Sequence, residues 1–78
     1  MNGPSEKDVE KAIIEILTRY REGLTFEELR GILEESGYYL NGLVLRRAVS
    51  NLILSNTVCK TPLKEKKKFL LILCKVNG

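Results

Sequence analysis

Apolar residues recur at intervals of three and four over most of the chain, which is the period of an α-helix that buries one face. The first series follows Ser5, which precedes Asp8 by three residues as in a capping box, and it stops before Gly23. One helical face then carries Val9, Ala12, Ile13, Ile16, Leu17 and Tyr20. The spacing predicts a helix from about residue 6 to about residue 22.

A second helix is predicted immediately afterwards. Thr25 and Glu28 form a Thr-x-x-Glu capping box, and Gly37 supplies a stop signal. Between these signals, one face carries Phe26, Leu29, Ile32 and Leu33. We therefore expect a short helix over about residues 25–36.

A third helical series lies between two asparagines. Asn41 can cap the start of a helix, and Asn56 can adopt the left-handed conformation that ends one. The apolar stripe between them consists of Leu45, Ala48, Val49, Leu52 and Ile53. The pattern predicts a helix over about residues 43–55, joined to the second helix by a tight turn that contains glycine.

The pattern changes after the third helix. Residues 57–61 and 69–75 are short β-prone or apolar runs, and they flank a lysine-rich segment at 62–68. This order predicts a β-hairpin with a basic tip, although a buried helix is an alternative for the second run. The second run is apolar on both faces, so either the first helix or a second protomer must cover its second face.

The composition is that of a small globular domain. Of 78 residues, 44% are hydrophobic and 29% are charged, which is compatible with a single domain that folds without a metal. No apolar run approaches the roughly 20 residues that span a bilayer, and the polar N-terminal residues do not resemble a secretory signal. We expect a soluble, cytoplasmic protein that does not associate with membranes.

The chain has no histidine and only two cysteines. It therefore lacks the usual zinc ligand sets and the commonest general base of enzymes. We expect no catalytic activity, no metal, no cofactor and no small-molecule ligand.

The two cysteines lie on either side of the predicted hairpin tip. A turn centred between Lys66 and Lys67 places Cys59 opposite Cys74, although other registers are open. In a mesophilic cytosol such cysteines stay reduced, whereas a hyperthermophile could oxidise them. We expect reduced thiols that pack as small apolar side chains.

Charge is divided between the two halves of the chain. Residues 1–40 contain five Lys and Arg against nine Asp and Glu, whereas residues 41–78 contain eight Lys and Arg against one acid, Glu65. The halves thus carry about −4 and +7, which the total of +3 conceals. Such a concentration of cations on part of a small domain is typical of proteins that bind nucleic acid.

Three helices followed by a β-hairpin, with a tight turn between the second and third helices, resemble the winged helix-turn-helix domain. The resemblance covers about residues 6–76, and its most family-like stretch runs from Leu45 to Leu52 with the small Ala48 in the apolar stripe. Asn56 stands where winged helices often have glycine. The resemblance implies an α+β fold whose third helix enters the DNA major groove and whose hairpin, the wing, contacts the backbone or the adjacent minor groove.

Four polar residues of the predicted third helix are candidates for DNA contact. With the apolar stripe inward, Arg47 and Ser50 point outward, and Arg46 and Asn51 flank them. Arginine can bind guanine in bidentate fashion, asparagine can bind adenine, and serine or arginine can hold phosphate. The alternative for each of the four is a solvated helix face.

Two leucines fall on the same outward side of this helix. Leu43 could contact a thymine methyl group, and Leu54 could pack beneath the hairpin. A protein-binding surface explains both residues more simply.

Lysines gather in the predicted wing. They are Lys60, Lys64, Lys66, Lys67 and Lys68. Because the ammonium group is a point charge, these residues should add affinity for phosphate and little choice of sequence. The alternative is a solubilising turn whose lysines blunt the strand edges, but the polar third helix favours the DNA interpretation.

These observations predict sequence-specific binding of double-stranded DNA by a small stand-alone transcriptional regulator that blocks or recruits polymerase. Regulators of this type are familiar in archaea and in their plasmids and viruses. The alternative is a winged helix that serves protein–protein assembly in a transcription, replication or scaffold complex. The apolar last strand is compatible with a homodimer. A third possibility is a protein that binds RNA or single-stranded DNA, but the candidates for stacking on bases are limited to Tyr38 and Tyr39.

Overall fold

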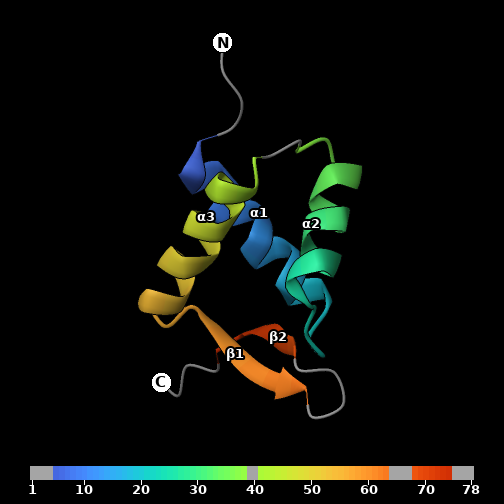
Figure 1. Cartoon of the computed structure of the whole chain (residues 1–78), viewed down its shortest axis with the longest axis vertical. Coiled ribbons are helices and arrows are strands. Elements are labelled where there is room, and N and C mark those ends of the chain that lie inside the picture. The colour runs from blue at the N-terminus through green and yellow to red at the C-terminus, as the bar shows by residue number, and fades with distance from the viewer. Residues whose placement is uncertain (1–4, 39–40, 64–67, 75–78) are drawn as a thin grey trace.

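The computed structural model describes residues 5–38, 41–63 and 68–74. In chain order it contains α1 (Glu6–Arg19), α2 (Phe26–Glu35), α3 (Gly42–Leu54), β1 (Val58–Leu63) and β2 (Lys68–Leu73). Figure 1 shows α1 behind the other two helices, with the hairpin lying across one end of the helical layer. The predicted α+β fold is confirmed: three helices are followed by an antiparallel hairpin in a winged-helix layout.

The helices begin at the caps that the sequence predicts. Ser5, Thr25 and Asn41 each accept a backbone N–H through the side-chain oxygen. At α2 the capping box is complete, because Glu28 also accepts the N–H of Thr25 at 2.9 Å. These contacts satisfy N–H groups that have no partner within a helix, which explains why each helix starts where it does.

The segment between α1 and α2 pairs with the hairpin, which the sequence did not predict. Leu24 and Leu71 exchange two backbone hydrogen bonds of 3.1 and 2.7 Å. To reach β2, the chain leaves α1 after Arg19 rather than near residue 22, and it turns at Gly23, whose φ is 102°. Gly23 lies against Ile72, so the chain itself covers part of the second face of β2.

One apolar core joins the three helices to the hairpin. Its largest fully buried side chains are Val9, Ile13, Leu17, Leu29, Leu33, Leu45 and Val58. Tyr20 departs from the predicted stripe and is largely exposed, because it lies beyond the end of α1. Within the described part of the chain no polar or charged side chain is buried, so the candidate functional groups all lie at the surface. None of the described helices is long and apolar enough to cross a bilayer.

The strands extend further toward the tip than the sequence predicts. Pairing runs from Val58 opposite Leu73 to Leu63 opposite Lys68, so part of the predicted tip at 62–68 belongs to the strands. Pro62 is tolerated because β1 is an edge strand, where a residue without an N–H can face solvent. The remaining tip, residues 64–67, lies outside the described residues.

The cysteines correct two of our expectations. Cys59 pairs with Ile72, two residues before Cys74, so the cysteines are diagonal neighbours and do not lie directly opposite each other. Their Cα atoms are 5.2 Å apart, and the two residues form a disulfide in place of the expected reduced thiols. Because the shift in register is an even number of residues, both side chains stay on one face of the hairpin and can meet.

Replacing Gly23 with alanine should lower the free energy of unfolding by about 1–3 kcal/mol. A Cβ atom there would lie 2.6 Å from Cγ2 of Ile72, and φ of 102° is unfavourable for any residue with a Cβ. Gly31→Ala is the matched control, since it meets nothing within 4 Å and should add about 0.4–1 kcal/mol. Urea denaturation followed by circular dichroism measures both; equal effects of the two changes would contradict this account of Gly23.

Candidate nucleic-acid interface

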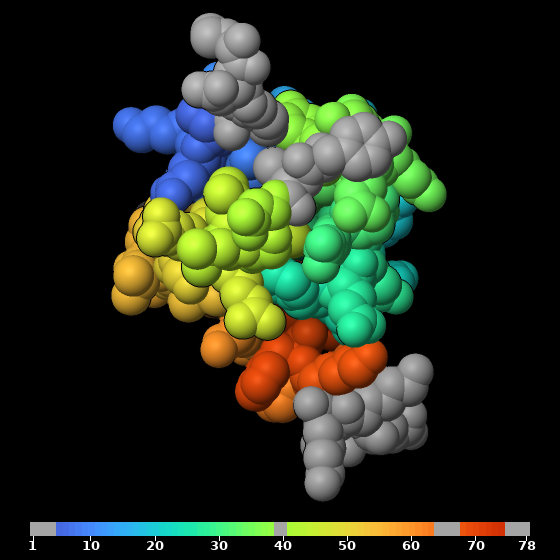
Figure 2. All heavy atoms as spheres, turned by 45° about the horizontal axis from the view of Figure 1, so that its top comes forward, coloured from blue at the N-terminus to red at the C-terminus, as the bar shows by residue number. Residues whose placement is uncertain are grey.

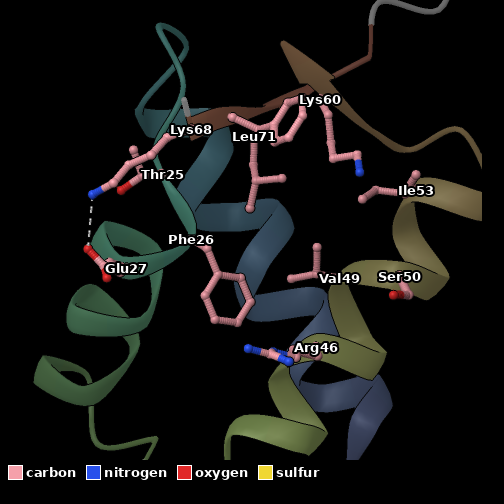
Figure 3. Close-up of a pocket in the computed structure, with 11 residues that line it drawn as sticks. Thr25, Phe26, Glu27, Arg46, Val49, Ser50, Ile53, Lys60, Lys68 and Leu71 are labelled. Atoms are coloured by element: carbon pink, nitrogen blue, oxygen red, sulfur yellow. Dashed lines mark hydrogen bonds and ion pairs between the residues drawn. The ribbon is translucent and has the colours of Figure 1, made fainter. Parts of the chain in front are cut away.

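A surface cleft of about 480 Å³ lies where the start of α2, one side of α3 and the hairpin meet. Its apolar lining consists of Phe26, Val49, Ile53, Phe69 and Leu71. Its polar lining consists of Thr25, Glu27, Arg46, Ser50, Lys60 and Lys68 (Figure 3). An apolar floor with three cations around it is suited to a ligand that combines an apolar part with a negative charge.

The period of α3 directs two of the predicted DNA contacts into this cleft. The buried stripe of α3 packs toward the core, and Arg46 and Ser50, one turn apart, lie beside the edge of that stripe at Val49. In Figure 3 the Arg46 side chain extends from α3 on the side that faces Phe26 of α2, and the hairpin residues Lys60 and Leu71 lie at the other end of the view. In the space-filling view, the yellow residues of α3 and the red residues of β2 form parts of one continuous surface (Figure 2).

The strand period places Lys60 and Phe69 on the hairpin face that borders the cleft. Lys60 pairs with Leu71, and Phe69 precedes Leu71 by two residues, so all three side chains share one face. Leu71 at the inner end of this face is buried, whereas Phe69 nearer the tip is 51% exposed. Lys60 Nζ lies 5.0 Å from the centroid of the Phe69 ring, a distance typical of a cation–π contact.

The three cations of the cleft differ in their partners. Lys68 Nζ lies 3.4 Å from Glu27 Oε1, an exposed ion pair that contributes little stability and can exchange for another anion. Among the described residues, no carboxylate lies within ion-pair distance of Arg46 or Lys60. The positive charge of the cleft is therefore least compensated at Arg46 and Lys60.

The other two predicted contacts lie on the opposite flank of α3, next to α1. Asn51 Nδ2 donates hydrogen bonds to Glu6 Oε1 at 3.3 Å and to Glu10 Oε2 at 3.1 Å. The guanidinium of Arg47 lies 3.8 Å from Glu6 Oε2. The structure thus separates the four candidate residues into two that line the cleft and two that are held by acids of α1.

The exposed leucines of α3 lie outward, as the helical projection predicts. Leu43 is 57% exposed and Leu54 is 81% exposed. The suggestion that Leu54 packs beneath the hairpin is wrong, because a side chain so exposed makes few contacts. Neither leucine lines the cleft.

Several residues that the sequence predicts to be functional do not line this cleft or lie outside the described residues. Of the five wing lysines, Lys60 and Lys68 line the cleft, while Lys64, Lys66 and Lys67 lie outside the described residues. Of the two tyrosines named for base stacking, Tyr38 packs against the core and Tyr39 lies outside the described residues.

Phe69 is a cleft residue that its sequence pattern does not mark as functional. It begins a run that is apolar on both faces, and this pattern indicates only a strand whose two faces must be covered. The available signal was its position directly after the lysine cluster, near the tip where a hairpin extends beyond the core. Phe26 was missed for a similar reason, because its helical spacing indicates only a core residue.

Comparisons with protein-family models, curated proteins and solved structures found no match to this chain. The winged-helix layout is evident from the order of its helices and strands, and the cleft and the surfaces around it are the features that bear on function.

Proposed function

We propose that this protein binds double-stranded DNA in a sequence-specific manner and regulates transcription, with α3 in the major groove and the lysine-rich wing on the phosphate backbone. The observation that carries the proposal is the convergence of Arg46 from α3 with Lys60 and Lys68 from the hairpin on one concave face. In a winged-helix layout these are the two elements that would approach a duplex together. We further propose that it acts in the cytoplasm, and that a homodimer would match a pseudo-palindromic operator.

The two flanks of α3 have different roles in this proposal. Arg46 and Ser50 have no acidic partner among the described residues, so they can contact base edges or phosphates directly. Arg47 and Asn51 must first leave Glu6 and Glu10, and such exposed contacts cost little to break. Repulsion between these acids and phosphate favours approach of the DNA from the hairpin side.

The test is a titration of duplex DNA at several salt concentrations. Binding should weaken steeply with salt, and log K should fall by about 0.9 for each phosphate contact per unit of log salt. Absence of duplex binding even at low salt would contradict the proposal.

Arg46→Ala is expected to weaken duplex binding by about 1–3 kcal/mol if the guanidinium contacts a base, and to reduce the salt slope by about one if it contacts phosphate. Lys11→Ala is the matched control, because it removes the same charge from the exposed face of α1 opposite the core. Fluorescence anisotropy with a labelled duplex measures both variants. Equal losses for the two would mean that net charge alone, and not the cleft, determines affinity.

A second candidate function is protein–protein assembly. It is favoured by Leu43 and Leu54, which are 57% and 81% exposed on the outward side of α3. A partner that covers this side should protect both leucines and compete with DNA. Light scattering over a concentration series with wild type and Leu54→Ala distinguishes self-association through these leucines from a monomer.

A further inference from the structure

We propose that the cleft between α3 and the hairpin holds one unpaired nucleotide of the bound DNA, with the base against Phe69 and its phosphate near Arg46 and Lys60. This inference rests on the proposed DNA-binding function and names a feature of the DNA that the cleft would recognise.

The shape and lining of the cleft favour a base over a paired backbone. Its volume of about 480 Å³ is in the range of sites for small molecules, about 300–1,000 Å³. Its floor is formed by Phe26, Val49 and Ile53 together with the hairpin residues. A stacked base pair exposes only its edges, so only an unpaired base offers a flat apolar face to such a floor.

Phe69 supplies the stacking surface. Phe69 is 51% exposed, one of four exposed large apolar residues in the described part of the chain, and of these four it is the one that borders the cleft. Every base has a π face, so stacking on a phenylalanine does not require a particular sequence. Lys60 Nζ lies over the ring at 5.0 Å from its centroid, so a base that stacks on that face displaces the ammonium group, which is then available to pair with the phosphate.

The charges around the cleft determine on which side the phosphate lies. On the α2 side, Glu27 presents a carboxylate, and the start of α2 is occupied by its own capping box of Thr25 and Glu28. On the α3 side, Arg46 has no acidic partner among the described residues. Because Glu27 and Lys68 neutralise each other, an anion is attracted less on the α2 side than near Arg46 and Lys60, whose charges have no such partner.

The experiment compares three labelled DNAs of otherwise identical sequence by fluorescence anisotropy: a perfect duplex, the duplex with a single-nucleotide bulge, and the same bulge without its base. The wild type should bind the bulged duplex about 5- to 100-fold more tightly than the other two, the range expected for one base stacked on an aromatic ring. Phe69→Ala should abolish this preference, so that the variant binds the bulged duplex no more tightly than the perfect duplex. Phe69→Leu, which keeps an apolar lining without a π face, should lose most of the preference.

Leu43→Ala is the control, because it removes a 57% exposed apolar side chain that does not line the cleft, and it should keep the preference. Equal binding of the two bulged DNAs, or a preference that survives Phe69→Ala, overturns the inference, since bulge flexibility alone would then explain it. Binding of the perfect duplex without any bulge preference overturns the inference and leaves the proposed function standing. Failure to bind all three DNAs overturns both.

Discussion

Reduction of the Cys59–Cys74 disulfide is expected to lower the free energy of unfolding by about 3 kcal/mol. The two cysteines are 15 residues apart, and a crosslink that closes a loop of this length removes conformational freedom from the unfolded chain. For a domain of this size the loss corresponds to a fall in Tm of roughly 12–24 °C. Thermal unfolding followed by circular dichroism, with and without reductant, measures the effect.

The control for reduction is the double variant Cys59→Ser and Cys74→Ser. Its Tm should be close to that of the reduced wild type and should not respond to reductant. Mass spectrometry after alkylation, performed before and after reduction, establishes whether the thiols are bonded in each sample. A wild type with alkylation-confirmed reduced thiols and an unchanged Tm would show that the crosslink contributes nothing to stability.

Replacing Leu45 with alanine is expected to lower the free energy of unfolding by about 2–5 kcal/mol. Leu45 is fully buried on the core side of α3, so truncation removes apolar contact and leaves a cavity. This loss is a large share of the roughly 5–15 kcal/mol that stabilises a typical small domain. Urea denaturation at constant temperature gives the difference directly.

Leu54→Ala is the matched control, since it makes the same chemical change on the same helix at a side chain that is 81% exposed. We expect a change within about 0.5 kcal/mol, because surface substitutions remove little buried area. Similar losses at Leu45 and Leu54 would indicate that Leu54 is covered in solution, as it would be in a protein–protein interface. Measurements at two protein concentrations separate that outcome from an effect within the monomer.

The separation of inward and outward residues along α3 connects stability to the proposed function. Leu45 and Val49 hold the helix on the core, while Arg46 and Ser50 line the cleft. The disulfide stabilises the hairpin, which forms the other side of the cleft, because it crosslinks the two sides of the hairpin that carries Lys60 and Phe69. The shape of the cleft therefore depends both on the packing of α3 against the core and on the disulfide in the hairpin.

Helix starts, helix faces and the presence of a hairpin were predictable from the sequence. Capping by Ser5, Thr25 and Asn41 involves residues no more than three positions away, and the helical period involves neighbours three and four apart. The pairing register of the hairpin was predicted less accurately. Apolar residues on both faces of the second run allow several alignments, so Cys59 was expected opposite Cys74 and is found opposite Ile72.

The candidate site was predictable as a list of residue types but not as an arrangement. A helical projection of α3 indicates that Arg47 and Asn51 lie away from the core, but it cannot show that acids of α1 lie next to them. Asn51 contacts Glu10 and Glu6 across 41 and 45 residues of sequence, so the pairing depends on how α1 and α3 pack. The same holds for the cleft, to which three separate elements contribute.

The sequence by itself determined the three helices, the hairpin and the concentration of positive charge in the second half of the chain, because each depends on composition or on neighbours within a few residues. The tertiary structure alone decided that Leu24 pairs with Leu71, that Phe69 and Lys60 border a cleft with Arg46, and that Glu6 and Glu10 hold the other flank of α3. These contacts join residues far apart in the chain, and they follow from the packing of the helices and hairpin around the shared core.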